Sequence, residues 1–242
     1  MGILRTFLNA ILPPRCLKCG RILAEKNGLC TECFNKIHFI GKPFCRRCGH
    51  PFANERLIEI GKHYLCGKCL QEKRPLLQMR RFAFMYDNES KKLILDFKFR
   101  DKTFYAEMLA YILYGAGKEI WEQNPDLIIP VPIHNKRLLK RRYNQSALLV
   151  KYLSKITQIA ADYKSLVRIE NTVPQVELSA HARRHNLNHA FAVKNLAFIK
   201  GKKIVLVDDV ETTGSTLKEC AKVLHKAKAD KIYAITLART EI

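Results

Sequence analysis

The chain has 242 residues, of which 48% are hydrophobic, so it is long enough to bury one full core together with a small second module. It contains no run of about 18 apolar residues, which argues against a membrane-spanning helix. Its 43 lysine and arginine residues against 22 acidic residues give a formal charge of +21. This excess favours a polyanionic partner such as nucleic acid, and a basic protein without such a partner is the alternative.

The first residues, 1–14, are apolar enough to resemble a signal peptide. However, Arg5 and Asn9 interrupt the apolar run, no small-residue cleavage pattern follows, and cysteines begin at once. We therefore expect no secretory signal. Apolar residues at helical spacing instead predict one face of a short helix, formed by Ile3, Leu4, Phe7, Leu8 and Ile11.

Eight of the nine cysteines form four Cys-x-x-Cys pairs. Two such pairs can close a tetrahedral shell of thiolates around one ion, so the module predicts two structural zinc ions. Disulfides and a thioredoxin-like redox site are the alternatives. They are disfavoured because the chain shows no secretory signal and because four pairs do not resemble one catalytic dithiol. The predicted metal ligands are Cys16, Cys19, Cys30, Cys33, Cys45, Cys48, Cys66 and Cys69.

The cysteine module contains an internal repeat. C-L-K-C-G-R followed by C-T-E-C-F is similar to C-R-R-C-G-H followed by C-G-K-C-L. The repeat favours sequential pairing, in which the first two pairs share one ion and the last two share the other. Interleaved pairing stays open, because ligand spacing alone permits it. Gly20 and Gly49 suit tight turns that need a positive φ.

From about residue 80 the pattern changes to alternating strands and helices, which predicts a mainly parallel α/β sheet with helices on both faces. We place the domain boundary between a cysteine module at 1–75 and an α/β domain at 76–242. Strands are expected at residues 81–86, 126–132, 165–170, 190–193, 204–207 and 231–238. Helices are expected at residues 91–99, 104–120 and 136–159, and from residue 217 onward. An irregular polar stretch is expected at 171–188.

The strongest candidate site lies where the strand at 204–207 ends. Asp208 and Asp209 follow the strand at once, and a short polar run then leads into a helix. Amide groups at a helix start, hydroxyls and a glycine make a phosphate cradle, whereas carboxylates accept hydrogen bonds from sugar hydroxyls. The combination predicts a phosphorylated ribose; the alternative is a generic strand end with acids facing solvent. The cradle consists of Thr212, Thr213, Gly214, Ser215 and Thr216.

The stretch V-L-V-D-D-V-E-T-T-G-S-T, residues 205–216, resembles the phosphoribosyl-diphosphate signature of type I phosphoribosyltransferases. Glu211 departs from this signature, in which an apolar residue is usual, so it either faces solvent or weakens ligand binding through like charge. Residues 130–145 are similar to the motif P-V-P-x-H-x-x-R-x-x-x-R-G-[FY]-N-Q of the ComF family, with Arg142 in place of its glycine. With the zinc module and a further motif at 168–191, the resemblance to this family covers nearly the whole chain.

The resemblance implies a type I phosphoribosyltransferase-like fold and assigns roles to residues. It implies that Asp208, Asp209, Arg137 and Arg141 act at the reacting sugar and its diphosphate. Mg²⁺ would be held chiefly by oxygens of phosphoribosyl diphosphate, and residues 171–188 would form a hood over the ligand. Besides the cradle, the ligand-binding residues implied are Pro132, Ile133, His134, Asn144 and Gln145.

The resemblance also implies a function. It is that of a cytoplasmic competence protein that handles incoming single-stranded DNA during natural transformation, with a competence helicase or other DNA-uptake machinery as further partners. An active phosphoribosyltransferase with an unidentified small-molecule acceptor, or a phosphoribosyl diphosphate sensor, is the alternative. The sequence identifies neither a base-reading pocket nor a general base, so turnover stays open.

Overall fold

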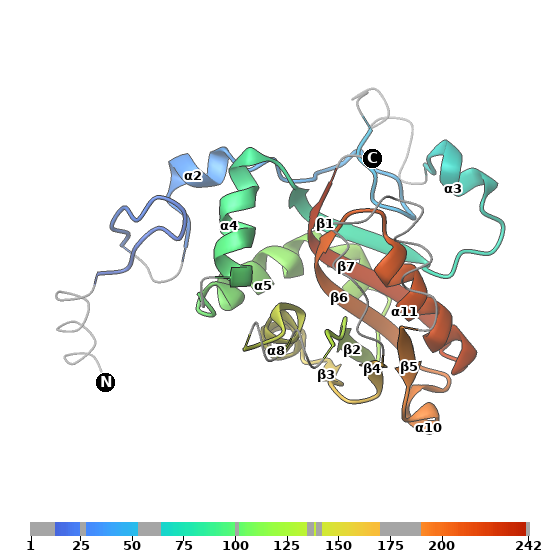
Figure 1. The fold of residues 1–242 in the computed structure, drawn as a ribbon. Helices are drawn as coiled ribbons and strands as arrows, with labels where there is room; N and C mark the ends of the chain where they lie inside the picture. The colour runs from blue at the N-terminus through green and yellow to red at the C-terminus, as the bar shows by residue number, and fades with distance from the viewer. Residues whose placement is uncertain are drawn as a thin grey trace.

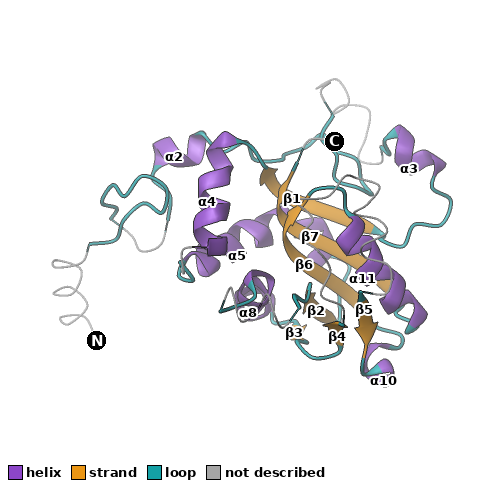
Figure 2. Ribbon diagram, in the orientation of Figure 1, coloured by secondary structure: helices purple, strands orange, loops and turns teal. Residues whose placement is uncertain are grey.

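The computed structural model describes residues 13–24, 28–52, 64–99, 102–134, 138, 142–169 and 190–240. At its centre is a five-stranded parallel sheet with the strand order β1-β7-β6-β2-β3 (Figures 1 and 2). The predicted parallel sheet is thereby confirmed. The strands are β1 Met79–Met85, β2 Leu127–Pro130, β3 Ala160–Ala161, β6 Lys203–Glu211 and β7 Lys231–Arg239.

Helices cover both faces of the sheet. One face packs against α4, α5 and α8, and the other against α10 and α11 (Figure 1). The central strand β6 supplies Val205 and Val207 to the first core and Ile204 and Leu206 to the second, which is the alternation expected of a strand buried on both sides. Within the described ranges, no helix combines the length and apolar character that a membrane crossing needs. The helices that cover the two faces of the sheet are α4 Asn88–Phe99, α5 Tyr105–Ala116, α8 Gln145–Thr157, α10 Leu196–Ile199 and α11 Ser215–Lys226.

Two predicted helices are interrupted in the structure. Within the helix predicted at 136–159, Leu138 is helical and α8 begins at Gln145. Between them Arg142 has a left-handed φ of 65° that a helix cannot contain, and Asn144 caps α8. The motif glycine that Arg142 replaces suits this conformation. The helix predicted at 104–120 divides at Gly117 into α5 and α6 (Lys118–Trp121). A Cβ atom on Gly117 would lie 2.6 Å from Ile235 Cδ1, so this turn needs glycine to approach the sheet.

A short antiparallel hairpin stands outside the main sheet. It pairs β4 (Leu166–Arg168) with β5 (Phe191–Val193). Leu166 and Phe191 belong to the core on the α11 side, so the hairpin packs over that face. The predicted hood at 171–188 lies outside the described residues, as does the short helix predicted near residues 3–11.

The cysteine module packs on the edge of the sheet at β1. Ile40 N–H donates to Ala83 O and Met85 N–H donates to His38 O, so the segment between the two cysteine clusters adds a short antiparallel bridge to β1. Leu17 and Ile37 enter the core on the α4–α5 side. The module therefore shares a core with the sheet. Its two short helices are α2 (Thr31–Asn35) and α3 (Gly67–Gln71).

Candidate functional site

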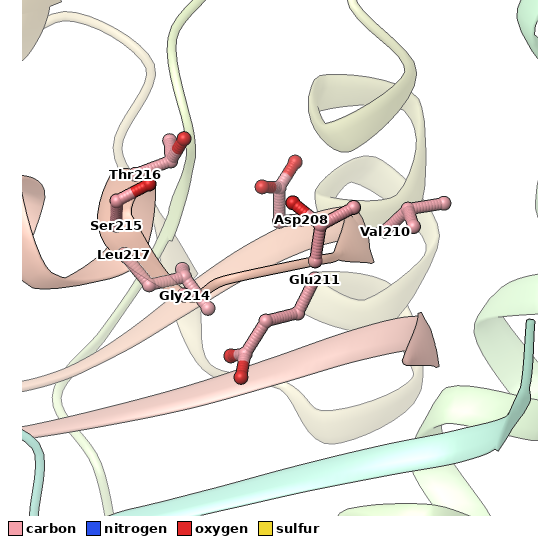
Figure 3. Close-up of a pocket in the computed structure, with 8 residues that line it drawn as sticks. Asp208, Val210, Glu211, Gly214, Ser215, Thr216 and Leu217 are labelled. Carbon is pink, nitrogen blue, oxygen red and sulfur yellow. The ribbon is translucent and has the colours of Figure 1, made fainter. Parts of the chain in front are cut away.

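The loop between β6 and α11 forms a small hollow (Figure 3). Gly214 caps the start of α11 with a left-handed φ of 73°. Just beside it, Thr213 Oγ1 and Ser215 Oγ lie 2.8 Å apart. The backbone angle favours glycine, and the space is tight as well, because a Cβ atom on Gly214 would lie 3.1 Å from Arg80 Nη1 and 3.2 Å from Glu211 Oε1. The lining residues are Asp208, Val210, Glu211, Thr212, Gly214, Ser215, Thr216 and Leu217.

The first turn of α11 suits an anion. Because the first N–H groups of a helix have no partner within the helix, they are available to an oxyanion, and the helix dipole adds partial positive charge. Ser215 Oγ and Thr216 bring hydroxyl groups to the same hollow (Figure 3). The cradle therefore has the groups that a phosphate would need, and phosphate binding itself stays a prediction.

The two carboxylates after β6 are held by a network. The Asp209 N–H donates to Asp208 Oδ1 over 2.9 Å, and Ser146 Oγ donates to the same oxygen over 3.1 Å. Lys98 Nζ pairs with Asp209 Oδ1 at 2.9 Å. Burial, followed by the charge of Asp209, raises the pKa of Asp208 to about 7. The acids thus do not form a generic solvent-facing strand end.

Sequence reasoning missed Lys98 and Ser146. Lys98 lies in the last turn of α4, about 110 residues before its partner Asp209, and no spacing rule connects two such positions. Ser146 directly follows the N-Q pair of the motif at 130–145. This position beside the motif is the one feature of the sequence that could have indicated a role for Ser146 in the site. Lys98 reaches Asp209 and Ser146 reaches Asp208 because α4 and α8 pack on one face of the sheet.

Asn144 and Gln145 hold α8 in place. The Asn144 side chain accepts the Ser146 N–H over 3.0 Å and donates through Nδ2 to Val131 O over 3.0 Å. Gln145 is 1% exposed and donates through Nε2 to Lys98 O over 2.9 Å. These contacts join the end of β2, the start of α8 and the end of α4. Direct ligand contacts from the two side chains stay a prediction.

A larger cleft of about 600 Å³ opens between the carboxyl end of β2 and the β4–β5 hairpin. Of the residues predicted to contact a ligand, Pro132, Ile133, His134 and Asn144 line this cleft, and the cradle lies in the other hollow. Arg137 and Arg141 lie outside the described residues. The cleft is lined by Pro130, Pro132, Ile133, His134, Leu138, Asn144, Ala147, Tyr163, Leu166, Val167, Arg168, Ile169 and Lys194.

Glu211 is buried, so the expectation that it faces solvent is wrong. Its side chain is 1% exposed and pairs with Arg80 Nη1 at 2.8 Å. The side chain points to the opposite side of the strand from Asp208 (Figure 3). Burial raises the pKa of Glu211, whereas the charges of Arg80 and Arg239 lower it. A neutralising arginine is therefore what lets this acid occupy an apolar position.

The eight paired cysteines form two compact clusters. In each cluster the four Sγ atoms lie within 4.8 Å of one another, and the pairing is sequential, as the repeat predicted. The Sγ atoms of Cys19 and Cys30 are 3.7 Å apart in the first cluster, and those of Cys48 and Cys66 are 3.6 Å apart in the second. Four sulfurs bound to one zinc ion at about 2.3 Å would lie at about this separation, so both clusters fit zinc. Gly20 and Gly49 have the expected positive φ, 80° and 65°.

Two known families match separate parts of the chain. The double zinc ribbon domain family matches residues 7–70. The phosphoribosyl transferase domain family matches residues 146–241, a range that includes both carboxylates and the whole cradle.

Similar proteins span nearly the full length. "Competence protein F" from Haemophilus influenzae is 36% identical over 234 residues, which cover 93% of this chain and 96% of that protein. "DNA utilization protein YhgH" from Escherichia coli O157:H7 is 33% identical over 95% of this chain and 98% of its own length. "Competence protein ComFC" from Bacillus subtilis is 24% identical over 90% of this chain and 87% of its own. Among solved structures, a purine phosphoribosyltransferase from Pyrococcus horikoshii aligns with 55% of this chain and 73% of its own, at 19% identity and a TM-score of 0.36.

Proposed function

Because the chain belongs to the ComF family of competence proteins, we propose that it handles incoming single-stranded DNA in the cytoplasm during natural transformation. We propose further that the hollow between β6 and α11 binds phosphoribosyl diphosphate together with Mg²⁺. The names of two relatives refer to competence and that of a third to DNA utilization, and these names support the first part. The geometry of the site supports the second.

The observation that carries the ligand proposal is the meeting of the Asp208 carboxylate with the N-terminus of α11 in one hollow. A phosphate at the first turn of α11 would accept hydrogen bonds from main-chain N–H groups and from the Ser215 hydroxyl. Asp208, on the wall of the same hollow, would accept hydrogen bonds from ribose hydroxyls. A ligand with phosphate at one end and sugar hydroxyls at the other satisfies both groups.

Each residue has a defined task in this proposal. Ser146 and the Asp209 N–H orient the Asp208 carboxylate, and Lys98 compensates the charge of Asp209 before the ligand arrives. Asn144 keeps the end of β2 close to α8. Magnesium would neutralise part of the diphosphate charge, and Asp208 and Asp209 are the nearby carboxylates that could contact it or its water ligands.

The charge of the chain supports the DNA proposal. The formal charge is +21, and two zinc ions with eight thiolates would lower it only to about +17. Basic residues are in excess on both sides of the predicted boundary, so a polyanion can be attracted to both parts. A competence helicase or other DNA-uptake machinery is the protein partner that we propose.

A second candidate function is phosphoribosyl transfer to a small acceptor. The observation that favours it is the cleft of about 600 Å³ beside the end of β2, which has room for a small acceptor. Asn144 and Ala147 line this cleft, and Ser146 between them binds Asp208. Transfer would pass through an oxocarbenium-like state, so the site would have to orient the acceptor and stabilise departing diphosphate.

The two functions are separated by one titration. A fluorescent single-stranded oligonucleotide is titrated with the full chain at several salt concentrations, with and without phosphoribosyl diphosphate and Mg²⁺, while released diphosphate is measured. DNA binding predicts that log affinity falls with log salt by about 0.7 for each phosphate contact. A slope near zero would rule out the DNA proposal, and diphosphate release with one of a panel of nitrogenous acceptors would support transfer.

The double variant Asp208→Asn with Asp209→Asn tests the ligand site in the same assay. It should lose phosphoribosyl diphosphate binding and keep the salt slope for DNA, because the carboxylates contact sugar rather than DNA phosphate in this proposal. Unchanged binding of phosphoribosyl diphosphate by the variant would contradict the assigned site.

A further inference from the structure

The second cysteine cluster is joined directly to β1 and β7, which lie on one side of β6 in the sheet. The carbonyl groups of Arg46 and Arg47, in the turn between Cys45 and Cys48, and of Cys48 itself all accept hydrogen bonds from β1 or β7. Arg80 N–H donates to Arg47 O over 2.7 Å. Arg81 Nη1 donates to Arg46 O over 2.9 Å, and Arg239 Nη1 donates to Cys48 O over 3.0 Å.

The contact between this turn and β1 leaves no free space. Gly49, directly after the turn, has a φ of 65°, and a Cβ atom there would lie 2.6 Å from Arg80 O and 3.1 Å from the Phe82 ring. The Arg81 guanidinium lies 4.7 Å from the centre of the Phe44 ring, on the other side of the turn. A displacement of the turn therefore has to move the main chain of β1 or break these contacts.

Arg80 connects this turn to the cradle. Its main-chain N–H binds the zinc turn, and its guanidinium pairs with Glu211 Oε1 at 2.8 Å. The same guanidinium lies 3.1 Å from the position that a Cβ atom on Gly214 would take. Arg239 makes a second connection, because it is the register partner of Glu211 on β7 and also donates to Cys48 O.

The connection through Glu211 depends on its ion pair with Arg80. The Glu211 side chain is 1% exposed, and among the described residues its Oε2 atom has no hydrogen-bond partner. A buried carboxylate that loses the arginine with which it pairs must move toward water or take up a proton. Either change would alter the last residue of β6, three residues before the glycine that begins α11.

The first cluster has no such path among the described contacts. Leu17 O accepts a hydrogen bond from the Tyr105 hydroxyl, Lys18 pairs with Glu89, and Lys92 Nζ donates to Lys18 O over 3.0 Å. These contacts reach α4 and α5 instead of β6 and α11. The two clusters therefore differ in what they support, although they share one sequence pattern.

We infer that zinc at the second cluster sets the geometry of the cradle through Arg80, Glu211 and Arg239, so that the second zinc ribbon regulates the affinity for a ribose phosphate. Arg80 and Glu211 are positioning residues in this scheme. The inference rests on the proposed ligand site. Without the ion, the turn at 45–48 would lose the metal bonds that hold its two cysteines together, and the arginines would lose the fixed positions of their carbonyl partners.

The test compares Cys66→Ser with Cys30→Ser in the full chain. The two positions match, since Cys66 and Cys30 are the N-caps of the short helices α3 and α2 and each belongs to one cluster. Zinc content, amide hydrogen exchange over residues 211–217, and ribose 5-phosphate binding by calorimetry are measured for both. We expect Cys66→Ser to speed exchange over 211–217 and to weaken ribose 5-phosphate binding about tenfold. Cys30→Ser should keep both properties of the natural chain.

Two results would overturn the inference. One is a Cys66→Ser protein that has lost one zinc ion but keeps the natural exchange rates and affinity. The other is an equal loss in both variants, which would indicate general destabilisation. If the natural chain itself does not bind ribose 5-phosphate, the proposed function fails, and the exchange measurement still decides the coupling.

A second pair of variants keeps the test decisive if Cys66→Ser does not fold. Arg80→Met with Glu211→Met removes both charges together and keeps side-chain bulk. Chelation of zinc should then change exchange over 211–217 less in this double variant than in the natural chain, because the main connection is already absent. An equal response to chelation in both proteins would contradict the role of the Arg80–Glu211 pair.

Discussion

Asp208 lies among groups that move its pKa in opposite directions. Burial and the charge of Asp209 raise the pKa to about 7, and the Asp209 N–H, Lys98 and Ser146 act against this increase. Because this value exceeds the ordinary 3.8, the contribution of Asp208 to stability is full below about pH 3.8 and is lost as the pH rises through about 7. Function needs the opposite state, since only the ionised carboxylate is purely an acceptor for ribose hydroxyls.

The affinity for ribose 5-phosphate should therefore rise between about pH 6 and pH 8, as Asp208 loses its proton. Calorimetric titration across this range measures the effect, and the Asp208→Asn variant should flatten the part of the profile that Asp208 causes. Phosphate itself titrates near pH 6, so inorganic phosphate is titrated over the same range as a control. A variant whose pH profile matches that of the natural chain would disprove the assignment.

Gly214 can be compared with Gly201, because both have a φ of 73°. Alanine at either position should cost about 1–2 kcal/mol in the free energy of unfolding, since both would place a Cβ atom in left-handed backbone. A Cβ atom on Gly201 meets nothing within 4 Å, whereas one on Gly214 meets Arg80 and Glu211. We thus expect only Gly214→Ala to weaken ribose 5-phosphate binding. Equal affinities for the two variants would contradict the assignment of the cradle as the phosphate-binding site.

At the scale of elements, the start of α8 joins the two walls of the site. Three consecutive residues, Asn144, Gln145 and Ser146, contact the end of β2, the end of α4 and the Asp208 carboxylate. The start of a solvent-exposed helix would need only the hydrogen bond of an N-cap side chain to a main-chain N–H. Here the same turn positions both the cleft and the carboxylate, so a small movement of α8 affects both.

Asn144→Ala and Asn195→Ala separate these two tasks. Both asparagines are N-caps that accept a main-chain N–H, so each substitution should lower the free energy of unfolding by about 1 kcal/mol, as measured with urea. Asn144→Ala also removes the hydrogen bond to Val131 O, so it should be the more destabilising and should weaken ribose 5-phosphate binding. Identical behaviour of the two variants would show that α8 does not organise the site.

At the scale of the whole molecule, the domain boundary predicted from the sequence does not separate two independent hydrophobic cores. We propose the boundary at residues 75 and 76, where the composition changes. Leu17 and Ile37, from the cysteine module, nevertheless pack in the core of the α/β part, and Phe39 bridges to Phe84 on β1. The module therefore stabilises the sheet as well as holding zinc.

A chain that starts at residue 76 should accordingly be less stable than the full chain. Burial of a leucine or isoleucine side chain contributes up to about 1.5–3 kcal/mol, so the loss of Leu17 and Ile37 alone should lower the thermal midpoint clearly. Scanning calorimetry of the two proteins measures this difference. Equal thermal midpoints for the two proteins would mean that the cysteine module contacts the sheet without stabilising it.

Local rules were enough for much of this fold. The apolar run at 204–207, the glycine at position 214 and the helical spacing after it predict a strand, a loop and a helix without reference to the rest of the chain. The cysteine repeat likewise favoured the sequential pairing that the structure has. These features were predictable because hydrophobic periodicity, backbone angles and metal-ligand spacing act over a few residues. The helix expected at 136–159 is interrupted, because the left-handed Arg142 and the cap at Asn144 are local features that apolar spacing does not report.

By itself, the sequence determined the parallel α/β class, the two four-cysteine clusters and the position of the cradle after β6. Only the tertiary structure decided that Lys98 and Ser146 hold the carboxylates, that Glu211 is buried against Arg80, and that the second cluster contacts β1 and β7. The physical reason is distance along the chain. Arg80 and Glu211 are separated by 131 positions, and such a pair meets only when β1, β7 and β6 lie side by side in one sheet.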